Sequence, residues 1–148
     1  MSSENVVQFK ERDHTGALIT ELLQERKEVW TLYCTVSGIE EHPTNKSFEE
    51  LIQAFCQLAV DYISLGHFGV YAKILDGSER RKSVVEAAAR IYPAMSKATE
   101  AVLDFNDKYQ KITPAKIVNE LSGDLSILGE HLANRIELED ELLGEMLG

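Results

Sequence analysis

Apolar residues recur three and four positions apart over four stretches of the chain, which is the spacing of a buried face on an α-helix. The strongest signal lies in residues 51–75, where two apolar rows run side by side: Leu51, Phe55, Leu58, Tyr62 and Leu65, and then Ile52, Cys56, Ala59 and Ile63. A third row at the same spacing is mostly polar and ends in an aromatic ring: Ala54, Gln57, Asp61, Ser64 and Phe68. The two apolar rows are enough to bury this helix, so the phenyl ring at the end of the polar row is not needed for that purpose. We therefore expect this third row to meet a partner.

Three further stretches each carry one row with helical spacing. The first is Ile19, Leu22, Arg26, Val29, Tyr33 and Val36; the second is Ala88, Ile91, Met95, Ala98, Val102, Phe105 and Tyr109; the third is Val118, Leu121, Leu125, Leu128, Leu132, Arg135, Glu139, Leu142 and Met146. No stretch shows a convincing strand pattern. Four long helices joined by short connections predict an all-α, up-down-up-down antiparallel four-helix bundle.

Local signals set the expected helix boundaries. The first helix runs from about residue 15 to Ser37-Gly38, where the glycine is a C-terminal cap. Capping boxes start the second and third helices, Ser47 with Glu50 and Ser83 with Glu86. Thr113-Pro114 starts the fourth helix. Residues 1–148 form a single domain in this prediction, with residues 1–15 frayed.

Two features interrupt the predicted helices. Pro93 lies inside the third row without breaking its phase, so it predicts a kinked third helix and not a break. Gly66 and Gly69 bracket His67-Phe68 in the second helix. They predict either a plain bend or a close approach of another group to the backbone.

Charged residues occupy three positions of the core rows. Arg26 in the first helix and Arg135 with Glu139 in the fourth must find partners if they are buried. Arg135 and Glu139 are four apart and can pair along the helix. The three residues predict a buried polar network, which either fixes the register of the helices or forms a bistable, ligand-sensitive core.

Composition narrows the class of partner. The formal net charge is −10 with a pI near 4.8, which disfavours direct binding to nucleic acid and suits a basic protein. An acidic surface that only keeps the protein soluble is the alternative. No apolar run reaches the length of a membrane span, and the start lacks the apolar core of a signal peptide. Cys34 and Cys56 are expected to be buried thiols, and the location is expected to be cytoplasmic.

Motifs for catalysis are not found. A di-iron site in a helical bundle needs two Glu-x-x-His motifs, and only Glu11 with His14 has that spacing. Cys-x-x-Cys pairs, a phosphate-binding loop and Gly-x-Ser-x-Gly are missing. We therefore expect no enzyme activity, no metal and no cofactor.

Longer motifs resemble a known family. They are Phe55-Cys56-Gln57, Val60-Asp61-Tyr62, Ser64, Gly66-His67-Phe68 and Tyr71, with Glu25-Arg26, Tyr33, residues 105–109, Asp124-Leu125-Ser126, Gly129-Glu130, Arg135 and Leu138-Glu139-Asp140 elsewhere. In this order they are similar to the Rsd/AlgQ family, regulators of the primary sigma factor of bacterial RNA polymerase. The likeness covers nearly the whole chain.

The resemblance implies an anti-sigma regulator. Family members are helical bundles that bind the C-terminal, helix-turn-helix region of the primary sigma factor, and thereby hinder its use by RNA polymerase and promoter DNA. The residues that it assigns to sigma binding are Asp61, Ser64, Phe68, His67 and Gly66, although His67 can equally be a structural histidine. The alternatives are a helical adaptor for another regulatory protein, such as a phosphotransfer-system or stringent-response partner, and a metal-binding bundle enzyme.

Overall fold

The computed structural model describes the backbone of residues 3–38, 47–111, 113 and 117–147; side chains are described for the same residues except 3–15 and 117–118. The chain in these ranges is helical and has no strand. The long helices are α1 (Ser3–Val36), α2 (Phe48–Gly66), α4 (Lys82–Tyr109) and α6 (Ser122–Leu147). Three short elements continue or precede them: η1 (His67–Tyr71), α3 (Ala72–Leu75) and η2 (Ile117–Leu121). The predicted all-α four-helix bundle is confirmed.

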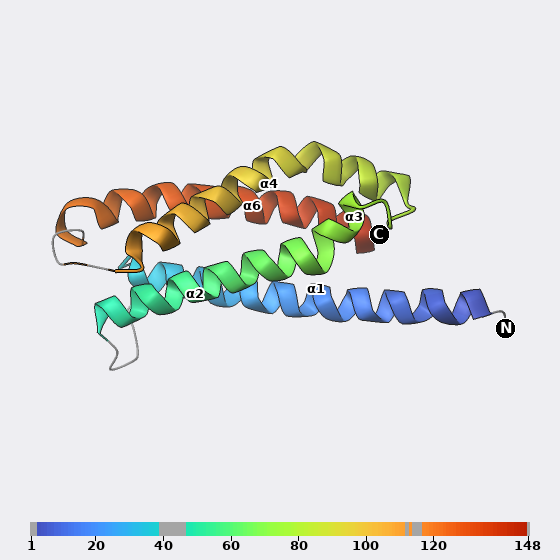
Figure 1. Ribbon diagram of the computed structural model, residues 1–148, viewed down its shortest axis with the longest axis horizontal. Coiled ribbons are helices and arrows are strands. Elements are labelled where there is room, and N and C mark those ends of the chain that lie inside the picture. The colour runs from blue at the N-terminus through green and yellow to red at the C-terminus, as the bar shows by residue number, and fades with distance from the viewer. Residues whose placement is uncertain (1–2, 39–46, 112, 114–116, 148) are drawn as a thin grey trace.

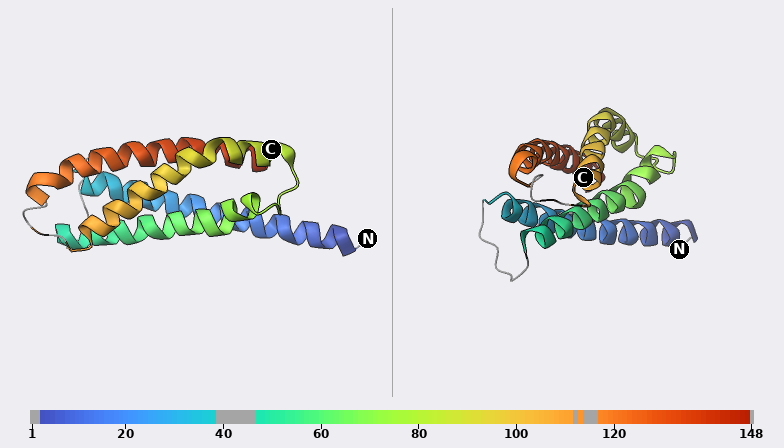
Figure 2. Two further views of the ribbon diagram at one scale, coloured as in Figure 1. Left: turned by 45° about the horizontal axis from the view of Figure 1, so that its top comes forward. Right: turned by 60° about the vertical axis from the view of Figure 1, so that its left-hand side comes forward.

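The four long helices lie along one another in two layers. α1 packs against α2, α4 packs against α6, and α2 also packs against α4. In Figure 1 the chain reverses direction from each long helix to the next. Figure 2 shows α1 and α2 on one side of the bundle, with α4 and α6 on the other, and the start of α1 extending beyond its neighbours. A charged group in the middle of this arrangement can therefore meet side chains from both layers.

The helix boundaries follow the sequence signals in part. Ser47 is the N-cap of α2, and its side chain accepts a hydrogen bond from the backbone N–H of Glu50 at 3.2 Å. Gly38 follows α1 with a φ of +77°, which favours glycine. The expected start of the fourth helix at residues 113–114 lies partly outside the described residues.

Two expected boundaries differ. α1 begins at Ser3, earlier than the periodicity predicted, and fraying of residues 1–15 stays a prediction. The capping box at Ser83 is wrong, because the N-cap of α4 is Arg81. The carbonyl of Arg81 accepts the first N–H bonds of the helix, from Val84 and Val85. Its guanidinium donates to the carbonyl of Met146 at 2.6 Å, which fixes this start against the end of α6.

The core rows lie where the periodicity put them. In α4 all seven members of the predicted row are buried, and so are the described members of the last row, from Leu121 at the end of η2 to Met146 in α6. In α2 the second apolar row is buried throughout, whereas Leu58 and Leu65 of the first row are half-buried. The inward face of α2 is therefore turned slightly toward the second row. Pro93 lies inside α4, and the kink expected there stays a prediction.

Candidate functional site

A π-helical turn interrupts the second helix where the two glycines suggested a bend or a close approach. α2 passes into η1 at His67, and the N–H of Ala72 bonds to the carbonyl of His67, five residues back. Such a turn places residues five apart above one another. A Cβ on Gly66 would lie 3.0 Å from Cε2 of Tyr71 and 3.3 Å from Nη2 of Arg135. The close approach is therefore real, and glycine makes room for it.

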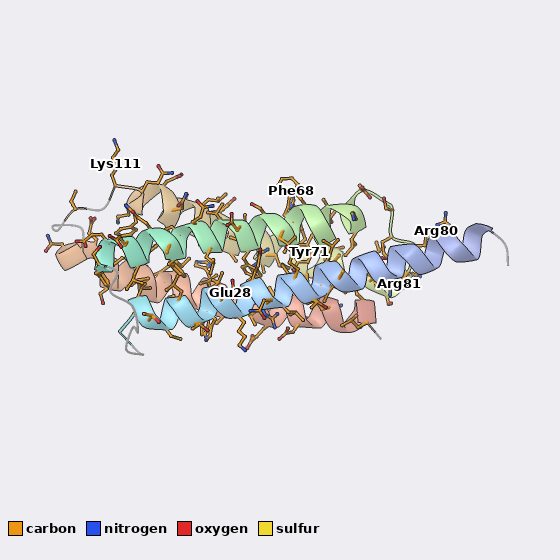
Figure 3. All side chains as sticks on the ribbon, turned by 90° about the horizontal axis from the view of Figure 1, so that it is seen from below. Glu28, Phe68, Tyr71, Arg80, Arg81 and Lys111 are labelled. Atoms are coloured by element: carbon orange, nitrogen blue, oxygen red, sulfur yellow. The ribbon has the colours of Figure 1, made fainter. Side chains whose placement is uncertain are left out.

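The polar row of α2 faces outward. Asp61 is exposed, and its Oδ1 accepts a hydrogen bond from Gln57 Nε2 at 2.9 Å. Phe68 is 72% exposed, the highest value among the large apolar side chains of the described residues. In Figure 3 Phe68 lies on the outer side of its helix, whereas Tyr71 lies on the side that faces the bundle. A bare phenyl ring and a carboxylate thus share one accessible row.

Carboxylates of α1 lie beside Asp61. Burial raises the pKa of Glu25, and the negative charges of Glu21, Asp61 and Glu28 raise it further. Oε2 of Glu25 is buried and finds no hydrogen-bond partner among the described residues. We call these four residues, Glu21, Glu25, Glu28 and Asp61, the acidic surface. Its mutual repulsion would be relieved by a cationic partner.

Beneath this surface, a carboxylate sits at the centre of the bundle. Glu139 is 0% exposed and receives hydrogen bonds from three helical segments. Its Oε1 accepts from the hydroxyl of Tyr62 at 2.6 Å and from Arg26 Nη1 at 3.4 Å, and its Oε2 accepts from the hydroxyl of Tyr71. Burial raises the pKa of both tyrosines, and the charge of Glu139 raises it further, so both remain neutral donors.

Two arginines complete the network. Arg26 also donates to Asp140 at 2.7 Å; burial opposes its charge, but Asp140 and Glu139 outweigh burial and raise its pKa. Arg135 is 1% exposed, and its guanidinium lies 5.4 Å from the ring centroid of Tyr62 and 5.8 Å from that of Tyr71. The predicted trio of Arg26, Arg135 and Glu139 is therefore brought together, with the two tyrosines between them.

An open groove runs between α2–η1 and α4. Its cavity volume is about 380 Å³, and its walls are mostly apolar. Ser64 and His67, both half-buried, line it together with Phe68, and so do Thr99 and the buried Tyr71 and Arg135. The ring of His67 meets that of Phe68 edge-on at 4.8 Å. The groove therefore joins the predicted contact residues to the buried network.

The predicted site residues occupy three environments. Asp61 and Phe68 are exposed, Ser64 and His67 line the groove, and Gly66 is buried against Tyr71 and Arg135. Gly66 can contribute to a partner surface only indirectly, by shaping the turn that presents Phe68. Tyr62 was assigned to an apolar row only, although a buried tyrosine hydroxyl signals a polar partner. The roles of Tyr71 and Thr99 could not be predicted from the sequence. Tyr71 is turned toward the core by the π-helical turn, and Thr99 lies on a different helix from its partner Arg135.

The described residues offer few signs of other chemistry. They contain no cluster of three or more His, Cys, Asp or Glu side chains that could hold a metal ion. Over the same ranges, none of the helices has both the length and the apolarity for a membrane crossing. Cys56 is a buried free thiol, and burial raises its pKa to about 11. Cys34 is half-buried, less than expected.

Comparison with known proteins agrees with the motifs. The family described as "Regulator of RNA polymerase sigma(70) subunit, Rsd/AlgQ" matches residues 2–147. A protein of Yersinia enterocolitica named "Regulator of sigma D" is 36% identical over 87% of this chain and 80% of its own length. Relatives with the same name from Yersinia pseudotuberculosis and an Enterobacter strain are 38% and 32% identical, each over 87% of this chain and 79% of their own length. No solved structure gives a significant match. Since the family match spans nearly the whole chain, the chain belongs to the Rsd/AlgQ family.

Proposed function

We propose that this protein regulates transcription by binding the C-terminal, helix-turn-helix region of the primary sigma factor. The observation that carries the proposal is the shared row of Asp61 and Phe68, both exposed, in which Asp61 is itself part of the acidic surface. A region that reads promoter DNA is rich in Lys and Arg, because it must contact phosphates. The family description and the names of the relatives support sigma as the partner.

Each contact residue has a distinct role in the proposed complex. Asp61 pairs with a cation of the partner while the acidic surface steers its approach. Phe68 fills an apolar pocket of the partner, since aromatic side chains commonly anchor interfaces. Ser64 is small and half-buried, so a partner helix can approach closely at that point. Occupying the DNA-reading region would keep sigma from promoter DNA and from core polymerase, in the cytoplasm where both are found.

A binding assay with the purified C-terminal region of the primary sigma factor tests the proposal. Asp61→Ala and Phe68→Ala should each weaken binding by roughly 1–4 kcal/mol, the range of interface anchors. Matched controls are Asp104→Ala, an exposed carboxylate on α4, and Ile127→Ala, an exposed apolar side chain on α6. Both controls should bind as the unchanged protein does.

Circular dichroism and thermal melting separate loss of contact from loss of fold. Both contact variants should keep the helical spectrum and the melting temperature, because neither side chain is buried. A sigma region that binds all four variants equally would refute the proposed surface. An unchanged protein that does not bind the sigma region would refute the partner itself.

A further inference from the structure

The groove between α2–η1 and α4 has a feature that a basic partner does not explain, namely a cation at its floor. Arg135 is 1% exposed and lines the groove from below. Its Nη1 donates to Thr99 Oγ1 at 2.7 Å, and Thr99 lines the same groove. The guanidinium of Arg135 therefore belongs to the buried part of the groove lining, next to the hydroxyl of Thr99.

Arg135 is incompletely satisfied in this position. Its Nε is buried and has no hydrogen-bond partner among the described residues. Oε2 of Glu139 lies 3.9 Å from that atom, close enough to share charge but too far for a hydrogen bond. Glu139 is moreover shared with Tyr62, Tyr71 and Arg26. A buried guanidinium has five N–H donors and gains from a further acceptor.

The mostly apolar walls of the groove favour a ligand with an apolar body. The large apolar side chains that stand exposed around it are Phe68, Leu75, Tyr92 and Leu103, and Ile91 and Met95 lie deeper. A volume of about 380 Å³ falls within the range of small-molecule sites, which are mostly apolar with a few convergent polar groups. Polar groups are few here as well: Ser64, Ser96 and His67 flank the opening, and Glu100 is exposed on the same wall.

We propose that this groove binds a small carboxylic acid with an apolar tail, the carboxylate toward Arg135 and the tail along the aromatic wall. A carboxylate can accept the hydrogen bond that Nε of Arg135 lacks, whereas the cationic side chain of a basic protein has no acceptor to offer. The exposed carboxylate of Glu100 would also oppose an anion that stayed at the rim, so the acid group belongs at the floor. This site does not depend on sigma binding, although Ser64, His67 and Phe68 border both surfaces.

Isothermal titration calorimetry with sodium decanoate, below its micelle-forming concentration, tests the proposal on the full chain. Decanoate should bind saturably at one site. Decanol, which has the same chain length without the charge, should bind about tenfold more weakly or worse, because hydrogen bonds to a charged group are the stronger ones. Equal binding of decanoate and decanol would overturn the role of Arg135.

Two variants test whether decanoate binds in the groove, and both keep Arg135 in the core. Ser96→Trp puts an indole into the groove and should abolish decanoate binding. Ser126→Trp makes the same change at an exposed position of α6 outside the groove and should leave binding unchanged. Decanoate binding that survives Ser96→Trp, or that is lacking in the unchanged protein, would refute the site. A sigma-binding assay in the same buffer shows whether the proposed function holds, independently of whether the ligand site does.

Discussion

At the scale of single residues, the molecule centres on one buried carboxylate. Glu139 accepts hydrogen bonds from Tyr62, Tyr71 and Arg26, which belong to elements distant in the chain, and it also faces Arg135 one turn away on its own helix. Taking a carboxylate out of water costs several kcal/mol, and only good geometry repays that cost. We expect this network to fix how the helices align, because a shifted register would separate Glu139 from Arg26, Tyr62 and Tyr71.

Glu139→Gln tests whether this network is structural. The amide keeps the shape but removes the charge that faces Arg26 and Arg135, so we expect a loss of roughly 3–5 kcal/mol in the free energy of unfolding, typical of a broken buried pair. Urea denaturation followed by circular dichroism measures it. Glu137→Gln, at an exposed position of the same helix, is the matched control and should stay within about 0.5 kcal/mol. Unchanged stability with altered partner affinity would instead favour the ligand-sensitive core.

Gly66 supports a second prediction at this scale. Gly66→Ala adds a methyl group that would press on the ring of Tyr71 and on Nη2 of Arg135. Overpacking of this kind destabilises by about 1–3 kcal/mol. Gly144 has open space around its Cα, so Gly144→Ala should be neutral or stabilising by up to about 1 kcal/mol. Thermal melting of both variants checks the contrast, and equal effects would contradict the close packing inferred at Gly66.

At the scale of elements, periodicity predicted the rows of every long helix, because burial of one face is what the three-four spacing encodes. It also placed Arg135 and Glu139 in a core row, and so predicted the network in outline. The π-helical turn of η1 was beyond such reasoning. An α-helical phase carried on from Tyr62 would turn Tyr71 away from the core, whereas the wider turn brings it back against Gly66 and Glu139.

Contacts between helices were harder to predict than the rows themselves. Thr99 lies on α4 and meets Arg135 of α6, and nothing in either local pattern links the two. The start of α4 shows the same limit. Ser83 and Glu86 have capping spacing, yet the N-cap is Arg81, whose guanidinium donates to the carbonyl of Met146, a group that is close only in the folded chain. Local propensity indicates which residues can start a helix or enter the core, and contacts between distant parts of the chain determine which of them do.

The carboxylates that lie where α1 faces α2 lead to a prediction about how stability depends on pH. Because the pKa of Glu25 is raised by burial and by neighbouring carboxylates, its ionisation opposes folding. The penalty is missing below the unfolded value of 4.5 and develops as pH rises through the raised folded value. Glu25→Gln should therefore be more stable than the unchanged protein at neutral pH, by about 0.5 kcal/mol, and not at acidic pH.

Urea denaturation of both proteins across this pH range measures the effect. Glu130→Gln, an exposed carboxylate of α6, serves as the control and should show no such pH-dependent gain. A gain in stability that is constant with pH would contradict the ionisation argument. If the acidic surface binds a basic partner, Glu25→Gln should also bind that partner more weakly, so that stability and function move in opposite directions.

At the scale of the whole molecule, charge governs how a partner arrives and apolar contact governs how long it stays. The net charge of −10 attracts a basic protein from beyond contact distance, and added salt screens that attraction over about 10 Å at 0.1 M. Once the complex has formed, an anchoring ring acts chiefly on the dissociation rate. In the proposed complex Asp61 would act on the first of these effects and Phe68 on the second, although both lie on one row.

Stopped-flow association with the C-terminal region of sigma, measured over a range of sodium chloride concentrations, separates the two. The association rate should fall steeply with salt for the unchanged protein and less steeply for Asp61→Asn, which removes one of the carboxylates beside Glu25. Phe68→Ala should keep the full salt dependence and dissociate faster, by roughly tenfold or more for an anchor of this size. An association rate that does not change with salt concentration would refute electrostatic steering. If the complex of the Phe68→Ala variant has an unchanged lifetime, the ring of Phe68 is not part of the interface.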